Sequence, residues 1–156
     1  MVTPKGEIKP AAAPEIDEEA IERAERALKS MANDFESWID EEVNLLTAAR
    51  DTLRANGISQ PAINMLSHRA HDLKGQGATL NFPFVTKVAE QLCRICEHLP
   101  SSEDLPLALV EAHVDAIRAI VRDGLRGDSD ATGIAIVSEL STRVGETLAH
   151  WRQRAT

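Results

Sequence analysis

The chain has 156 residues, 43% of them hydrophobic and 27% charged, a composition that suits one globular domain with a hydrophobic core. Its net charge of −8, with no basic cluster, argues against nucleic acid as a partner. No apolar run approaches the ~20 residues that cross a bilayer, and the N-terminus lacks the apolar core of a signal peptide. We therefore expect a cytoplasmic protein with no membrane contact.

The first third of the chain predicts a tail and a long helix. Residues 1–14 hold three of the seven prolines, and we expect them to be a flexible tail. From Glu15 to Ala55 there is neither Gly nor Pro, and apolar residues recur every three or four positions. This pattern predicts one long helix, or two if Asn33-Asp34 breaks it. Residues 15–34 would then be an additional helix or an extension of the following one.

Turn and cap residues divide the next part of the chain. Asn56-Gly57 predicts a helix C-terminus, and Ser59-Gln60-Pro61 predicts the start of a second helix that runs to about Leu80. Asn81-Phe82-Pro83 repeats this cap-then-proline pattern before a third helix. We expect the third helix to end near Leu99-Pro100.

Two more helices are expected, over residues 106–126 and 131–154, with Asp128-Ser129-Asp130 capping the second of them. No segment alternates polar and apolar residues with period two, so no strand is predicted. The fold class is therefore all-α, an antiparallel bundle with short loops.

One helix carries a histidine away from its apolar side. At ~100° per residue, His71 points about 130° from the centre of the apolar stripe, so we expect it to be exposed. Lys74 lies at the flank of the same face. The stripe has spacings of 3, 4, 3, 4 and 3, and its members are Ile63, Leu66, Ala70, Leu73, Gly77 and Leu80.

Two glycines in this helix need an explanation, because glycine in a helix interior costs about 1 kcal/mol relative to alanine. We expect this cost to be offset by the advantage of open space around His71. Helical side chains lean toward the N-terminus, so a large residue at position 75 would crowd the imidazole. Gly75 leaves a shallow bay that the surface of another protein can enter.

An exposed imidazole, a lysine one turn later and empty space together suit phosphoryl transfer. The ring must protrude for in-line attack on phosphorus, and the Lys74 ammonium can stabilise charge on the phosphoryl oxygens. An unperturbed imidazole has a pKa near 6.5, so a neutral nucleophile is present around neutral pH.

The string His71-Asp72-Leu73-Lys74-Gly75 resembles the signature of histidine-containing phosphotransfer (HPt) domains. That signature reads H-x-L-K-G, four variable residues, an apolar residue and a glycine. Leu80 matches the apolar position, and Asn81 departs from the final glycine. Asn tolerates a left-handed backbone, so we expect the turn to be kept. Residues 92–97, LCRICE, look like the L-C-x-x-L-E-like run of the family's next helix.

The resemblance implies an antiparallel four-helix bundle, which we place at residues 35–156, and a relay role. HPt domains accept a phosphoryl group from the aspartate of a receiver domain and pass it to another receiver. Receiver domains, and a hybrid histidine kinase that carries one, are thus the implied partners. His71 would be the phospho-accepting residue, with Lys74 stabilising charge and Gly75 providing clearance.

The same resemblance assigns the Mg²⁺ used in transfer to the receiver, so we expect no cofactor or metal here. The sequence also has no G-x-x-x-x-G-K-[ST] and no kinase-type glycine loop, which argues against ATP-dependent kinase activity.

A receiver is expected to dock over His71 against the next helix and four nearby residues. These docking residues are Asn64, His68, Ala78 and Thr79. Gln76, on the far flank, is not expected to touch the phosphate, whereas Phe82 and Phe84 are candidate apolar contacts, one of them being expected in the core.

Metal binding is a rival interpretation of the same residues. His68 and His71 have a ligand spacing of three, and Cys93, Cys96 and His98 lie one helix later, so a Zn²⁺ site is conceivable. The two cysteines lie on a helix rather than in a turn, however, and we interpret them as reduced residues of the core or its edge.

Two rival functions also fit a helical bundle. A dimerising scaffold or partner-binding bundle, in which His71 has no role, would use the long first helix, and the sequence leaves the oligomeric state open. A hydrolase with His71 as general base would need a nucleophile motif and a deep pocket, and neither is predicted. His98, His113 and His150 lack matching neighbours, and we expect them at the surface or its boundary.

Overall fold

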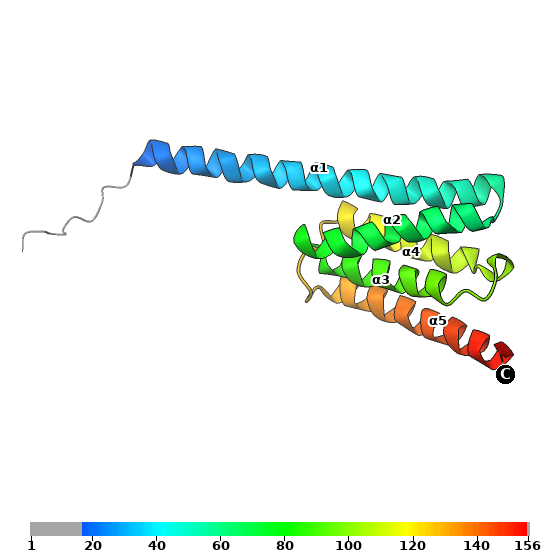
Figure 1. Cartoon of the computed structure of the whole chain (residues 1–156). Helices are drawn as coiled ribbons and strands as arrows, with labels where there is room; N and C mark the ends of the chain where they lie inside the picture. Colours follow the sequence, from blue (N-terminus) through cyan, green and yellow to red (C-terminus); the bar gives the residue numbers. More distant parts are fainter. Residues whose placement is uncertain (1–16, 156) are drawn as a thin grey trace, which may run out of the picture. The chain divides into compact units, whose positions relative to one another are not determined.

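The structure is a computed structural model that describes residues 17–155 (Figure 1). All its regular elements are helical and these residues contain no strand, which confirms the all-α prediction. The expected tail, residues 1–14, lies outside the described residues. The elements are α1 (Glu18–Asn56), α2 (Gln60–Thr79), α3 (Pro83–Glu97), the 3₁₀ turn η1 (Ser102–Asp104), α4 (Leu107–Arg122) and α5 (Ala131–Ala155).

The chain divides into two compact units, Met1–Phe35 and Glu36–Thr156. The described part of the first unit is the beginning of α1, and none of its side chains is buried. The second unit holds the rest of α1 and helices α2–α5, and the buried apolar residues of the described chain all lie in it. α1 continues without interruption through Asn33-Asp34, so one long helix is observed rather than two.

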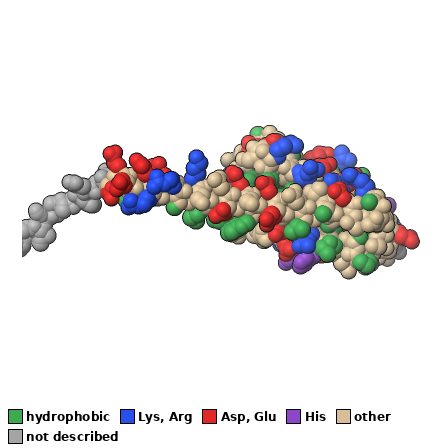
Figure 2. Space-filling model, turned by 90° about the horizontal axis from the view of Figure 1, so that it is seen from above, with side chains coloured by type: hydrophobic (Ala, Val, Ile, Leu, Met, Phe, Trp, Pro, Cys, Tyr) green, Lys and Arg blue, Asp and Glu red, His purple; other side chains and the backbone are tan. Residues whose placement is uncertain are grey.

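Within the second unit, consecutive helices from α2 to α5 run antiparallel and are joined by short loops (Figure 1). α3 packs against α2, α4 and α5, and it therefore contributes to the centre of the core. Acidic and basic side chains are interspersed over the face seen in Figure 2. The fully buried residues of α3 are Phe84, Val85, Val88, Ala89, Leu92 and Ile95.

The helix boundaries follow the predicted caps closely at most ends. Gly57 has φ 88° after α1, and the Ser59 hydroxyl accepts a hydrogen bond from the Ala62 amide at the start of α2. The Asp130 carboxylate caps α5 by accepting from the Gly133 amide at 3.0 Å. α3 ends at Glu97, two residues before the expected position.

The predicted end of α4 at residue 126 was wrong, because the helix stops at Arg122. Gly124 adopts φ 64°, and its amide donates to the carbonyl of Val121. The amide of Leu125 donates to the carbonyl of Ile120 at 3.0 Å. This pair of bonds is a Schellman motif, which satisfies the last carbonyls and ends the helix.

The turn between α2 and α3 uses the same motif with asparagine in place of glycine. Asn81 has φ 65°, the only positive φ of a non-glycine residue in the described chain, which confirms the left-handed turn predicted there. The Phe82 amide donates to the Gly77 carbonyl at 2.6 Å, and the Asn81 amide donates to the Ala78 carbonyl. Arg126 reinforces the turn, because its guanidinium donates to the Leu80 carbonyl and lies 4.3 Å from the centre of the Phe82 ring.

Two polar side chains are buried in the bundle. Arg50 on α1 is 4% exposed, and its guanidinium bonds Asp51 at 2.8 Å and Asp115 of α4 at 3.3 Å. His113 on α4 is 0% exposed, so the prediction that it lies at the surface or its boundary was wrong. His98 and His150 are exposed, as expected.

His113 is held in its neutral form. Its Nδ1 donates to the Leu109 carbonyl at 2.7 Å, while the buried Nε2 has no hydrogen-bond partner among the described residues. Burial lowers the pKa of His113 below its usual 6.5, although the bond to Leu109 opposes this shift in part. A proton on Nε2 would be a buried charge with no acceptor.

This environment predicts that the fold loses stability in mild acid. Below about pH 6.5 the unfolded chain protonates His113 while the folded chain does not, so the free energy of unfolding falls as the pH decreases. The loss attributable to His113 between about pH 7.5 and 5.5 should be at most about 1.4 kcal/mol, measured by urea unfolding at the two pH values. His113→Phe should remove that loss, and the exposed His150→Gln should not. An equal pH dependence in all three chains would contradict the assignment.

Candidate functional site

His71 lies on the exposed side of α2, and the helix determines this placement. Ile63, Leu66, Ala70, Leu73 and Leu80 are all buried, so the predicted stripe is confirmed and faces the core. His71, on the opposite side of the helix, is exposed, which confirms the sequence expectation. No hydrogen bond or ion pair within residues 17–155 engages its ring. Both ring nitrogens are therefore available to a second molecule.

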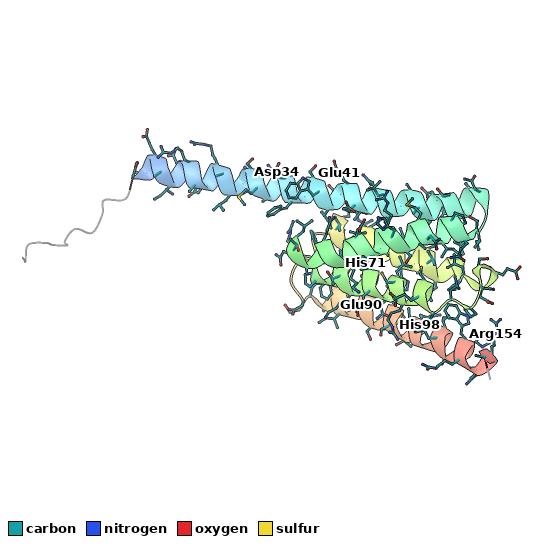
Figure 3. The ribbon with its side chains drawn as sticks, viewed as in Figure 1. Asp34, Glu41, His71, Glu90, His98 and Arg154 are labelled. Atoms are coloured by element: carbon teal, nitrogen blue, oxygen red, sulfur yellow. The ribbon has the colours of Figure 1, made fainter. Side chains whose placement is uncertain are left out.

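Lys74 lies one turn after His71 and is partly buried. Burial raises the pKa of the Cys93 thiol on α3, and the positive charge of Lys74 opposes that shift. The charge of Lys74 is therefore close enough to α3 to act on this thiol. Figure 3 labels His71 on α2 and Glu90 on the neighbouring α3. The backbone carbonyl of Lys74 accepts a hydrogen bond from Thr86 of α3 at 3.1 Å, which holds this turn of α2 against α3.

The two glycines of α2 have different surroundings. A Cβ added at Gly75 would meet nothing within 4 Å, so there is open space beside the histidine turn, as the bay predicted at this position requires. A Cβ at Gly77 would lie 2.5 Å from the Thr86 Oγ1 and 2.9 Å from the Thr86 amide nitrogen. Gly77 is therefore required by the close approach of α2 and α3 rather than by space around His71.

The predicted docking residues all lie on the surface of α2. Asn64, His68, Ala78 and Thr79 are exposed. The side-chain Oδ1 of Asn64 accepts a hydrogen bond from Gln60 Nε2, and His68 Nε2 lies 3.6 Å from the Asp72 carboxylate. When His68 is protonated, it can partly neutralise the acid that directly follows His71. Residues 17–155 leave all four of these side chains exposed.

Phe82 and Phe84 are both almost fully buried, so the suggestion that one of them contacts a partner was wrong. Phe82 packs beneath the α2–α3 turn, and the Phe84 ring occupies the space that a side chain at Gly133 of α5 would need. Gln76, the neighbour of Gly75, is partly buried.

Thr86 is the contributor to this site that the sequence did not reveal. Its hydroxyl and its backbone both approach α2, next to Lys74 and Gly77. A single threonine near the start of a helix carries no signal of its own. The signal that could have indicated a close neighbour was Gly77 itself, because glycine in an apolar stripe often marks close backbone approach.

The cysteines have the properties of core residues. Cys93 is buried, Cys96 is partly buried, and both are unpaired thiols. Burial and the neighbouring Cys93 raise the pKa of Cys96 to about 11, although a hydrogen bond with Ser67 acts in the opposite direction. Both residues are therefore protonated near neutral pH, and a thiol is a poor nucleophile and metal ligand. Within residues 17–155, no three His, Cys, Asp or Glu side chains come together in a way that could hold a metal ion.

A histidine on a rigid helix, open to solvent and near one cation, can act on a group that another molecule presents. No helix in residues 17–155 combines the length and the apolar character that a membrane span requires. A family model described as "Hpt domain" matches residues 17–123, which is more than half of the chain. The match begins one residue before α1, ahead of the predicted bundle boundary, and ends between α4 and α5. Neither the curated proteins nor the solved structures contain a match.

The contrast between the two glycines predicts opposite effects of the same substitution. Gly75→Ala should raise the free energy of unfolding by up to about 1 kcal/mol, because alanine favours the helix and meets no neighbour. Gly77→Ala should lower it, because the new methyl group collides with Thr86. Urea unfolding of both variants measures the two effects.

Thr86→Ala in the Gly77→Ala chain should recover only part of the lost stability, because the Thr86 amide and the Phe82 carbonyl still crowd the new Cβ. Equal unfolding free energies for Gly75→Ala and Gly77→Ala would contradict this account of the α2–α3 contact.

Proposed function

This chain belongs to the Hpt domain family, and we propose that it serves a phosphorelay by carrying a phosphoryl group on His71. Hpt domains are histidine phosphotransfer modules that interact with receiver domains. The observation that carries the assignment to this residue is the exposure of His71 within the H-x-L-K-G string of α2.

The proposed reaction exchanges one bond for another at phosphorus. A neutral ring nitrogen of His71 uses its lone pair to form an N–P bond, while the P–O bond to the receiver's aspartate breaks and the carboxylate leaves. Donation to a second receiver reverses these steps with the new aspartate as nucleophile. Both directions need approach in line with the breaking bond, and the exposed ring with open space at Gly75 supports such an approach.

Lys74 is proposed to stabilise the charge that spreads over the phosphoryl oxygens during transfer. Its backbone carbonyl accepts a hydrogen bond from Thr86, so the turn that carries the ammonium is held against α3. Asp72 is the nearest acid in sequence, and its contact with His68 supports a role for that histidine in reducing repulsion of the phosphate.

The partners in this proposal are two receiver domains, one as donor and one as acceptor, and a hybrid histidine kinase that carries a receiver domain. The proposed docking surface is the exposed side of α2 at Asn64, His68, Ala78 and Thr79, together with the adjacent side of α3. The receiver would supply Mg²⁺, and this chain would use neither ATP nor a metal of its own. The proposal places the relay in the cytoplasm, the compartment expected from the sequence.

Replacement of the histidine tests the acceptor directly. His71→Gln should keep the helical circular dichroism spectrum and lose acid-labile labelling by a phosphorylated receiver, because no nucleophilic nitrogen remains at this position. The matched control is His150→Gln, an exposed histidine on α5, which should label like the unchanged chain. Labelling of His71→Gln at the normal level would place the acceptor elsewhere.

Filling the bay tests the clearance argument. Gly75→Leu should leave the fold intact and slow transfer at least tenfold, because the larger side chain covers the approach to the imidazole. Gly145→Leu is the matched control, since Gly145 is an exposed glycine of α5 with open space at its Cβ. Rates of phosphoryl loss from a labelled receiver measure the effect. Equal rates for the two leucine variants would contradict the clearance role.

A further inference from the structure

The first part of α1 exposes large apolar side chains. Ile21, Leu28 and Met31 are 44%, 65% and 51% exposed, and no side chain between residues 18 and 35 is buried. Figure 2 shows apolar side chains along one edge of α1, while acidic and basic side chains crowd its start. Several large apolar residues on one side of an exposed helix usually mark an interaction surface.

The spacing of these residues is that of a coiled coil. Ile21, Ala24, Leu28, Met31 and Phe35 are separated by 3, 4, 3 and 4 positions, so they occupy successive a and d positions of a heptad repeat. We call this set the α1 seam. A period of 3.5 keeps a seam facing a second helix along its length. The stripe of α2 has the same spacing and is buried in the core, whereas Ile21, Leu28 and Met31 of the α1 seam are exposed.

The residues beside the seam suit a second copy of the same helix. In a parallel pair in register, Glu25 faces Ala20 of the other copy, and Ala27 faces Ala32, so no like charges meet at these positions. The bases of this segment, Arg23, Arg26 and Lys29, take outer positions of the heptad. Small flanking residues also let two helices approach closely.

We propose that residues 18–35 of α1 pair with the same segment of a second copy of this chain in a short two-stranded coiled coil. A two-fold contact covers both seams at once, because each copy offers the same surface. The seam is shorter than the three to four heptads that define an independent coiled coil, so the pairing is weak and depends on concentration. This inference does not depend on the role of His71.

Charge makes the pairing depend on salt in a particular direction. The chain has a net charge of −8, and the segment from Asp17 to Phe35 contains six acids and three bases. Two copies therefore repel each other at long range, and salt screens this repulsion without weakening apolar contacts. Self-association through the seam strengthens as ionic strength increases, whereas docking driven by opposite charges would weaken.

Sedimentation velocity of the full chain over a hundredfold concentration range, at low and high salt, tests the proposal. The unchanged chain should shift from monomer toward dimer, and more so at high salt. Leu28→Glu should raise the dissociation constant at least about tenfold by placing a charge in the seam. The matched control is Ile134→Glu, at an exposed isoleucine of α5, which should dimerise like the unchanged chain.

A second measurement distinguishes loss of pairing in Leu28→Glu from local unfolding of α1 in that variant. Leu28→Cys, in a chain whose two native cysteines are replaced by alanine, should form a disulfide-linked dimer under mild oxidation, and Ser138→Cys on α5 should not. A monomer at every concentration, or a dimer that Leu28→Glu leaves unchanged, would overturn the proposal, as would a partner protein that binds the seam while the chain alone stays monomeric. Labelling of His71 in the same variants reports the relay separately.

Discussion

The close approach of α2 to α3 at Gly77 and Thr86 is the contact on which the site depends. It leaves no room for a Cβ at position 77 of α2, and it brings the Thr86 hydroxyl within hydrogen-bond distance of the Lys74 carbonyl. The turn that carries the candidate site is therefore fixed through its backbone, and the side chains of His71 and Lys74 need no contacts of their own to be positioned. Under the proposed role, a backbone fixed in this way suits a group that meets more than one partner.

The turn after α2 holds the C-terminal end of this helix in place. A Schellman motif closes the helix, Asn81 takes the left-handed conformation that glycine usually supplies, and Arg126 bonds the Leu80 carbonyl while covering the Phe82 ring. Arg126, in the α4–α5 loop, thus supports the end of the helix that bears the histidine. The substitution of Asn for Gly at this turn is tolerated because the side chain adds little strain in that conformation.

The sequence was informative where local rules apply. Prolines, glycines and cap residues located the helices, and the 3–4 spacing of α2 placed His71 in solvent. It was less informative where a residue's role depends on another helix, as for Thr86. His113 shows a different failure, because Val110, His113, Ile117 and Ile120 have the 3, 4, 3 spacing of a buried stripe. The period was visible, and the polarity of histidine was given too much weight against it. The predicted end of α4 was too late because Gly124 is the left-handed residue that follows the helix and not a residue within it.

The exposure of His71 has a consequence for selectivity. The described chain leaves His71 exposed, and a Cβ added at Gly75 would meet no atom within 4 Å. Under the proposed role, a phosphoryl group held there would be as accessible to bulk water as to any protein that collides with it. Discrimination between productive and unproductive encounters then rests with the visiting molecule, which must bring the enclosure that this surface lacks.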